Sequence, residues 1–370
     1  MHHNFYLTAI ATLFGSFILV MYLIPKIRYI VEHRKLIDHP DKRSSHKTSI
    51  PTMAGISFFL TLILAINLIK TWDVDGVGIN FIAALTIIFA LGLKDDLIMS
   101  TPKAKIGGEI IAIICILFCN CLQITSLEGF LGIYEIPSVV SYALTTLIIL
   151  TIINSYNLID GIDGLASTIG IVIFSVFGFI FFKTGIHFYF ILCLCLIGIQ
   201  LGYLRYNLSR TKKIFMGDTG SLIMGFCIGF LSLKFLSLDA SLLTESSFIP
   251  ENKFLVIVSL LFVPLFDTLR VIGIRLINKK GLFSPDRNHI HHVLINSGLS
   301  HIKASLFLGF LSLGLSIVLI SLSMYLTSFQ MLGALIVSFM LLLGVFDRLK
   351  NNVKTENRSK YLLRAIHFLF

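Results

Sequence analysis

Residues 154 to 165 read Asn154-Ser-Tyr-Asn157-Leu-Ile-Asp160-Gly161-Ile-Asp163-Gly164-Leu165, and long apolar runs flank them at 138–153 and 165–182. Carboxamide or carboxylate side chains recur here at steps of three, without any Lys or Arg. If the preceding helix continues into this stretch, Asn154 and Asn157 share one face. The Asp-Gly pairs then predict a break where the backbone turns. Because Asn and Asp beside a membrane segment are costly, the stretch predicts a functional site. A polar turn alone would explain the Asp-Gly pairs but not both asparagines.

The composition is that of an integral membrane protein. Of the 370 residues, 56% are hydrophobic and 14% charged, and the mean hydropathy is +0.89. Soluble domains average roughly 45–50% apolar and 25% charged residues. The apolar runs reach the roughly 20 residues of a spanning helix. Because they are continuous and do not alternate with polar residues, they exclude an outer-membrane β-barrel. No basic residue precedes the first run, so we expect a retained helix and not a cleaved signal peptide.

Hydropathy predicts an all-α polytopic bundle of about eleven membrane helices. The predicted spans are 5–24, 51–70, 79–93, 106–124, 138–153, 165–182, 187–204, 218–236, 254–274, 304–326 and 328–346. If these helices alternate in direction, the loops on one side carry 25 Lys or Arg and those on the other carry four. This asymmetry predicts an outside N-terminus and a cytoplasmic C-terminus. It also explains the net charge of +10 without nucleic-acid binding.

The spans predict one transmembrane domain, 1–346, followed by a basic cytoplasmic tail, 347–370. The tail has scattered apolar residues, which are compatible with a short interfacial helix or with a disordered segment. All six cysteines lie in apolar runs, so we expect buried free thiols and no disulfide framework.

Two polar clusters precede residues 154–165 (the opening stretch) on the predicted cytoplasmic side. The first runs from Asp38 through Arg43 and His46 to Lys47, and it could simply satisfy the positive-inside rule. The second is the Asp95-Asp96 pair, followed by Lys105. Adjacent carboxylates repel one another, so at the mouth of an apolar helix they favour a nearby cation such as Mg²⁺ held with phosphate. A solvated acid pair is the alternative.

Two further clusters follow the opening stretch. Phe215-Met216-Gly217-Asp218-Thr219-Gly220-Ser221 offers a carboxylate and backbone N–H groups where a helix begins, which suits a metal–phosphate group or a plain helix cap. Asp267 and Arg270 are spaced to neutralise one another. The run Asp286-Arg287-Asn288-His289-Ile290-His291-His292 resembles a zinc site, but no Cys accompanies it. Phosphate recognition or proton transfer is therefore favoured. Because all these clusters lie on the same predicted side of the membrane, we expect one site there for Mg²⁺, phosphates and a base or sugar.

These motifs, in this order, resemble those of the polyprenyl-phosphate N-acetylhexosamine-1-phosphate transferases, which include the WecA-like enzymes and the phospho-MurNAc-pentapeptide translocases. The resemblance covers residues 38–292, and the His-Ile-His-His form with eleven spans is more similar to the WecA-like branch. Two positions depart from the family pattern: Ala54 replaces the first Gly of a pair, and Glu109 replaces an expected Gln.

The resemblance implies transfer of a sugar-1-phosphate from a UDP-N-acetylhexosamine to undecaprenyl phosphate, with release of UMP. It implies a bacterial inner membrane enzyme with a cytoplasmic active site and Mg²⁺, or Mn²⁺, as cofactor. By the same resemblance Asp218 is the principal metal ligand, and Asp95 and Asp96 help to place the metal or the lipid phosphate. His289 and His291 complete the implied catalytic set. The implied substrate-binding residues are Arg43, His46, Lys105, Asn154, Asn157, Asp160, Asp163, Arg287 and His292.

Several alternatives stay open at the level of sequence. A secondary transporter would also have membrane acids, although its site would lie near the midplane on broken helices. A non-catalytic lipid- or nucleotide-binding descendant is the other alternative. The sequence does not select the amino sugar, the glycan pathway (O-antigen, teichoic acid or capsule), or which of Asp95 and Asp96 acts as a base. It also leaves open a homodimer, because lipid-facing and partner-facing helices have similar compositions.

Overall fold

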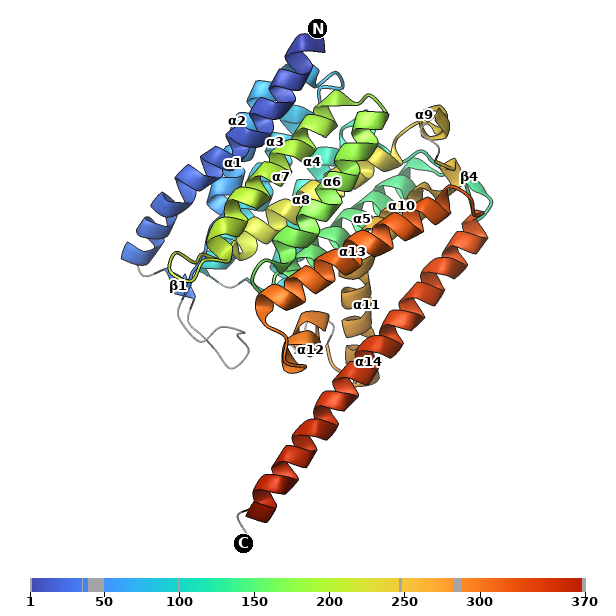
Figure 1. Ribbon diagram of the computed structural model, residues 1–370. Coiled ribbons are helices and arrows are strands. Elements are labelled where there is room, and N and C mark those ends of the chain that lie inside the picture. The colour runs from blue at the N-terminus through green and yellow to red at the C-terminus, as the bar shows by residue number, and fades with distance from the viewer. Residues whose placement is uncertain are drawn as a thin grey trace.

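The computed structural model describes residues 2–34, 36–38, 50–98, 100–245, 248–281 and 288–367. Within these ranges nine helices are long and apolar enough to cross a membrane, and a bent pair of shorter helices makes a tenth candidate. The prediction of an all-α, multi-pass membrane protein is therefore confirmed. The N-terminus of the first helix and the C-terminal end of the last lie at opposite ends of the molecule (Figure 1).

The helices follow one another with short connections. They are α1 (His2–His33), α2 (Gly55–Ile69), α3 (Gly78–Leu97), α4 (Pro102–Leu117), α5 (Ser138–Ile159), α6 (Leu165–Lys183), α7 (His187–Asn207), α8 (Gly217–Leu236), α9 (Ala240–Glu245), α10 (Lys253–Leu260), α11 (Phe262–Ile277), α12 (Ile290–Asn296), α13 (His301–Ser323) and α14 (Ser328–His367). Single 3-10 turns are η1 (Lys70–Trp72), η2 (Asn120–Leu122) and η3 (Pro250–Asn252). Two antiparallel pairs of short strands are β1 (Ile37–Asp38) with β2 (Ile50–Pro51) and β3 (Ser126–Phe130) with β4 (Ile133–Glu135).

Two predicted spans do not correspond to a single helix long enough to cross a membrane. The fourth, 106–124, corresponds to α4, whose 16 residues extend about 24 Å, less than the roughly 30 Å of a hydrocarbon core. The ninth, 254–274, is divided at Leu261 into α10 and α11, which meet at 71°. Pro264 lies in the first turn of α11, where a proline is tolerated because its missing N–H would have no partner inside the helix.

The tail 347–367 continues the last helix. Helix α14 runs without interruption from Ser328 to His367 and extends well past the rest of the bundle (Figure 1). The tail is thus described through His367 as part of α14. All six cysteines are free, as expected, and four of them are buried.

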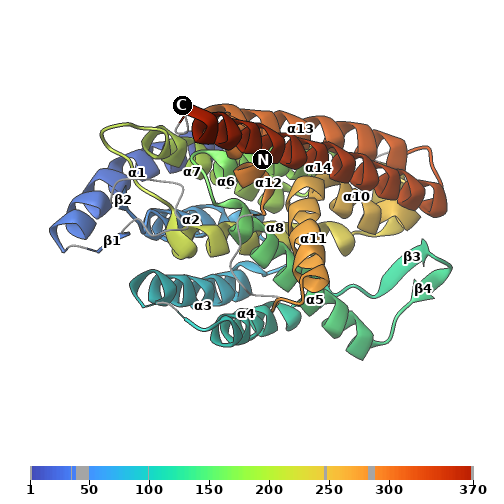
Figure 2. The ribbon, with the colours of Figure 1, turned by 90° about the horizontal axis from the view of Figure 1, so that it is seen from below.

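Helix α8 lies at the centre of the bundle. Seen from below, α13 and α14 run along one edge of the molecule and α3 and α4 along the other, with α8 between them (Figure 2). Seventeen of the 20 residues in α8 are buried. Such burial explains why α8 is largely apolar all around its circumference between its first and last turns, instead of amphipathic.

Glycines bring the backbones of α2 and α3 against the first turn of α8. A Cβ added to Gly55 would lie 2.2 Å from the backbone nitrogen of Gly220, and one added to Gly92 would lie 2.5 Å from the Cα atom of Thr219. The Gly55 N–H also donates to the Met216 carbonyl at 3.1 Å. These contacts fix the depth at which α8 begins, and hence the position of Asp218.

We therefore expect Gly55→Ala to destabilise the protein by about 1–3 kcal/mol, because the added methyl group meets backbone atoms that cannot rotate away. The matched control is Gly15→Ala in α1, where the added Cβ has no neighbour within 4 Å. Thermal unfolding in detergent, followed by fluorescence-detected size exclusion, should show a lower melting temperature for the first variant only. Equal melting temperatures would contradict the close-packing interpretation.

Candidate active site

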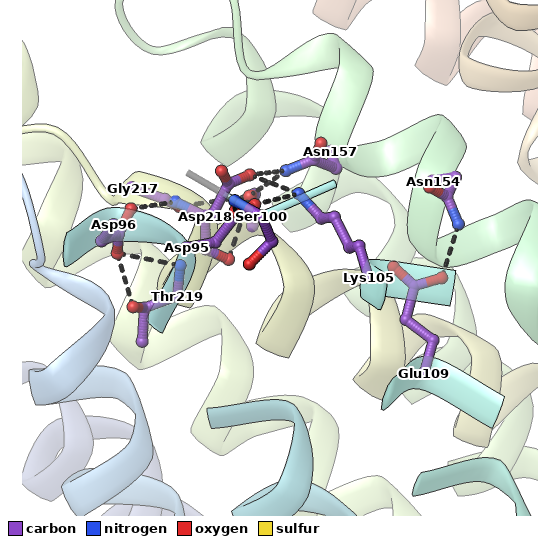
Figure 3. Close-up of polar contacts among 11 residues, drawn as sticks. Asp95, Asp96, Ser100, Lys105, Glu109, Asn154, Asn157, Gly217, Asp218 and Thr219 are labelled. Atoms are coloured by element: carbon purple, nitrogen blue, oxygen red, sulfur yellow. Dashed lines mark hydrogen bonds and ion pairs between the residues drawn. The ribbon is translucent and has the colours of Figure 1, made fainter. Parts of the chain in front are cut away.

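Four predicted residues meet where α3, α4, α5 and α8 converge (Figure 3). The Lys105 Nζ donates to Asp95 Oδ2 at 3.0 Å and to Asp218 Oδ1 at 2.9 Å. The Asn157 Nδ2 donates to the same Asp218 oxygen at 2.6 Å and to Ser221 Oγ at 2.7 Å. Residues more than 100 positions apart thus form one polar cluster at the ends of otherwise apolar helices.

Local sequence explains why Lys105 faces this cluster. The Thr101 side chain caps α4 by accepting from the Ala104 N–H, and Pro102 occupies the first helical position. Lys105 therefore lies in the first turn of α4. Burial lowers the pKa of Lys105, but the adjacent Asp218 and Asp95 carboxylates outweigh burial and raise this pKa above its usual value. The ammonium group is charged and bridges two carboxylates.

The Asp96 carboxylate accepts hydrogen bonds from the backbone at the start of α8. Its Oδ1 accepts from the Asp218 N–H at 2.7 Å, and its Oδ2 accepts from the N–H of Thr219 and from the hydroxyl of the same residue. Gly217 has φ +71°, and a Cβ there would lie 2.6 Å from both Asp96 oxygens. A negative charge at the start of a helix is favourable, because the first N–H groups lack partners in the helix. Asp96 therefore positions the backbone that carries Asp218.

The opening stretch behaves as the sequence predicted. Helix α5 continues through Asn154 and Asn157 and ends at Ile159, and a turn follows. Gly164 has φ +78°, and its N–H donates to Asn207 Oδ1 of α7 at 2.6 Å. The break thus depends on a glycine and on a side chain from another helix.

Asp160 and Asp163 lie in this turn but have different surroundings. Burial, together with the negative charges of Asp218, Asp96 and Asp163, raises the pKa of Asp160 to about 7. Asp163 Oδ2 accepts from Lys213 Nζ at 2.6 Å and lies 3.1 Å from His301 Nδ1. Burial alone would raise the pKa of Asp163, but these two bases lower it below its usual range. His301 had not been predicted; it lies at the start of α13, outside the motifs.

Asn154 binds partners outside the Asp95–Lys105–Asp218 cluster. Its Nδ2 donates to Glu109 Oε2 at 2.7 Å and to the Leu150 carbonyl at 2.9 Å (Figure 3). Asn154 and Asn157 share a helix face as expected, but only Asn157 contacts Asp218. Glu109, noted in the sequence only as a departure from a family pattern, is thus the partner of Asn154.

The histidine segment is held by α11. Asp267 Oδ2 lies 2.9 Å from His289 Nδ1, and Asp267 Oδ1 accepts from the Ile290 N–H at 2.9 Å. The expected neutralisation of Asp267 by Arg270 is wrong. The Arg270 guanidinium instead donates to the Asn288 carbonyl and lies 3.5 Å from Asp347 of α14. Bonds to the histidine segment and to Asp347 of α14 thus take the place of the pair that local spacing predicted.

His291 connects this segment to the opening stretch. The Nε2 of His291 lies 2.3 Å from where a Gly161 Cβ would be, so its ring is packed against the bare backbone of that turn. The rings of His289 and His291 are stacked with centroids 5.6 Å apart, and the His292 ring follows at 4.3 Å from that of His291. Burial, and then the neighbouring His292, lowers the pKa of His291 well below its usual value. His291 is therefore neutral in this arrangement.

The last helix also reaches the histidine segment. Lys350 Nζ of α14 donates to Asn288 Oδ1 at 2.7 Å. No motif signalled this contact, because α14 begins about 40 residues after Asn288. Three predicted residues, Arg43, His46 and Arg287, lie outside the described residues, so their predicted roles stay predictions.

The donor set around Asp218 fits Mg²⁺. Among the residues that the structure describes, no three His, Cys, Asp or Glu side chains form a metal-binding group. Mg²⁺ does not need such a group, because it is usually held by one or two carboxylates together with waters and substrate phosphates. Asp95 and Asp218 converge on a single cation, the Lys105 ammonium, and the Asp218 side chain is 34% exposed. Asp95 and Asp218, with the Asn157 amide nearby, would hold the metal.

Comparison with known proteins identifies one family. The profile of glycosyl transferase family 4 matches residues 78–236, which include Asp95, Asp96, Lys105, the opening stretch and Asp218. The probable undecaprenyl-phosphate N-acetylglucosaminyl 1-phosphate transferase of Bacillus subtilis (strain 168) is 31% identical over 355 residues, 95% of each chain.

Two further relatives are similar over most of their length. The undecaprenyl-phosphate alpha-N-acetylglucosaminyl 1-phosphate transferase of Escherichia coli O157:H7 is 27% identical over 302 residues, 80% of this chain and 79% of that protein. The decaprenyl-phosphate N-acetylglucosaminephosphotransferase of Mycobacterium tuberculosis (strain CDC 1551 / Oshkosh) is 28% identical over 308 residues, 76% and 74% of the two chains.

The bonds of Asp96 predict a structural penalty for its neutralisation. We expect Asp96→Asn to reduce the free energy of unfolding by about 1–3 kcal/mol, because an amide group would face the backbone N–H groups of α8 with a donor. Asp75→Asn is the control. Asp75 lies just before α3, is partly exposed and forms an ion pair with Lys234 of α8. Loss of this pair should change the free energy of unfolding by less than about 1 kcal/mol. Thermal unfolding of both purified variants compares them; equal shifts would contradict the assigned role of Asp96.

Proposed function

The chain belongs to the polyprenyl-phosphate N-acetylhexosamine-1-phosphate transferases of glycosyl transferase family 4, in the WecA-like branch, and we propose that it transfers N-acetylhexosamine-1-phosphate from a UDP-sugar to undecaprenyl phosphate. A phosphate oxygen of the lipid attacks the sugar-linked phosphorus of the donor. The bond between that phosphorus and the oxygen bridging to the uridine phosphate breaks, so UMP leaves with that oxygen. The product is an undecaprenyl-pyrophosphoryl sugar that starts a cell-envelope polysaccharide.

One observation carries the proposal: Asp95, Lys105, Asn157 and Asp218 meet at the ends of four apolar helices. Phosphoryl transfer needs mainly positioning and charge neutralisation. Two carboxylates for a metal and a nearby half-buried ammonium that neutralises negative charge supply both. We expect Mg²⁺, or Mn²⁺ in its place, to neutralise diphosphate charge when bound to Asp95 and Asp218.

The other residues have distinct roles in this proposal. Asp96 keeps the Asp218 backbone in place through the first N–H groups of α8. Asn157 steadies the Asp218 carboxylate. Asp160 and Asp163 accept hydrogen bonds from the nucleoside, a task suited to carboxylates.

The remaining predicted residues would contact the phosphates and the sugar. Positive or hydrogen-bonding side chains suit both groups. In this proposal they are Arg43, His46, Arg287, His289, His291 and His292. Asn154 would act indirectly, through its hydrogen bond to Glu109.

For the donor we propose UDP-N-acetylglucosamine, because the relatives reported above are named for that sugar. A single extra hydroxyl contact is enough to change such a preference, so the sugar needs direct measurement. We further propose that the site faces the cytoplasm of a bacterial inner membrane. The excess of Lys and Arg in the loops on the predicted cytoplasmic side supports this orientation.

The decisive measurement is UMP release by purified protein in detergent, with undecaprenyl phosphate, Mg²⁺ and a panel of UDP-sugars. We expect release with one N-acetylhexosamine donor, and its loss on addition of EDTA. Turnover without sealed vesicles would exclude a transporter. Nucleotide binding without any turnover would favour a non-catalytic binding protein instead.

We expect Asp218→Asn to lower UMP release by about 100-fold or more at saturating Mg²⁺, since one charged group at the phosphates is lost. The protein should still fold, because the backbone of residue 218 remains bound to Asp96. The control is Asp75→Asn, which lies just before the start of α3, far from Asp95 at its end, and should keep the wild-type rate. Wild-type turnover in Asp218→Asn would refute the metal assignment.

The raised pKa of Asp160 predicts pH-dependent donor binding. With a pKa of about 7, Asp160 is largely protonated at pH 6 and becomes an acceptor carboxylate by pH 8. Without divalent metal, we expect the dissociation constant for UDP-N-acetylglucosamine to fall about fivefold across this range, because the acceptor form becomes more populated. Isothermal titration calorimetry can follow the change, and Asp160→Asn should remove it. The same pH dependence in Asp160→Asn would assign it to other groups, such as the histidines.

A further inference from the structure

Glu109 is a buried acid whose role the proposed reaction does not explain. Its side chain has no solvent exposure, and Oε2 accepts from Asn154 at 2.7 Å. Oε1 is also buried and has no hydrogen-bond partner among the described residues. A buried carboxyl oxygen without a partner is costly, so a structure that keeps one calls for an explanation.

Lys105 lies one helical turn before Glu109 on α4. Residues four apart on a helix are neighbours on its surface, within reach of a lysine–glutamate pair. The Lys105 ammonium at present occupies the space between Asp95 and Asp218. A divalent cation bound to the same two carboxylates would compete with that ammonium for their oxygens and repel it.

We propose that Glu109 is a second position for the Lys105 ammonium. When the metal binds Asp95 and Asp218, Lys105 rotates toward Glu109 Oε1 and forms an ion pair there. Lys105 and the metal thus exclude one another from the carboxylate pair, and Glu109 makes the exchange easier. Glu109 is a positioning residue in this proposal, which rests on the metal site proposed above.

The charges agree with such an exchange. In the metal-free site, one ammonium faces the two carboxylates of Asp95 and Asp218. With a divalent metal in place, the metal, the ammonium and the two carboxylates together carry a net charge of about +1. The ionised carboxylate of Glu109 brings this sum to zero. A glutamine at this position would keep the Asn154 contact through its amide oxygen but could not balance the charge.

Direct Mn²⁺ binding tests this inference without relying on turnover. We would titrate purified protein in detergent with Mn²⁺ and measure the free ion by electron paramagnetic resonance, with four proteins: wild type, Glu109→Gln, Lys105→Gln and the double variant. We expect about tenfold weaker binding in Glu109→Gln than in wild type, because Lys105 loses its second position. In Lys105→Gln we expect binding at least as tight as in wild type.

The double variant decides between the alternatives. If Glu109 acts through Lys105, adding Glu109→Gln to Lys105→Gln should change Mn²⁺ affinity by no more than about twofold. An equal tenfold loss in both backgrounds would mean that Glu109 acts on the metal directly, and no loss in either would leave it without this role; both results overturn the inference. Melting temperatures of the four proteins check that each is folded.

The proposed metal site has its own control in the same assay. Asp218→Asn should bind Mn²⁺ at least tenfold more weakly than wild type. Unchanged binding in Asp218→Asn would overturn both the metal site and this inference. Weaker binding in Asp218→Asn together with no effect of Glu109→Gln would overturn the inference alone.

Discussion

The first turn of α8 is only partly exposed, since Thr219 and Gly220 are buried, and its N–H groups need acceptors there. Asp96 supplies them, taking the N–H groups of Asp218 and Thr219. A buried helix start without such partners would be strongly disfavoured. Gly55 and Gly92 let α2 and α3 approach closely enough for this to happen. The position of Asp218, and with it the cluster that includes Lys105 and Asn157, follows from this backbone requirement.

The two adjacent acids of α3 therefore have different surroundings, which their sequence does not reveal. Asp96 is saturated by the backbone of α8, whereas Asp95 accepts from the Ser100 N–H with one oxygen and from Lys105 with the other. A cation can exchange with Lys105 at Asp95, but nothing comparable can replace a backbone N–H at Asp96. This difference favours Asp95 over Asp96 as a direct participant in metal or phosphate binding.

Sequence patterns drew attention to Asn157 and Asp218, which the structure brings into contact, because polar groups at the ends of apolar helices stand out from their surroundings. The helix break after Ile159 followed from the Asp-Gly pairs. Pairings between distant segments were not predictable. Asp267 is bonded to His289 and not to Arg270, and Asn154 to Glu109. Such pairs depend on how helices pack, and local spacing carries no information on packing. The division of α10 from α11 and the length of α14 were missed for similar reasons, since hydropathy alone does not mark a bend or a helix end.

The family profile ends at residue 236, yet the contacts of the opening stretch extend beyond it. His291 lies against the bare backbone of Gly161, so the turn after α5 and the segment before α12 share one contact surface. That segment is in turn held by Asp267 and Arg270 of α11 and by Lys350 of α14. The late helices are thus connected to the opening stretch through a short chain of direct contacts, and the histidines contact helices that follow them in the sequence.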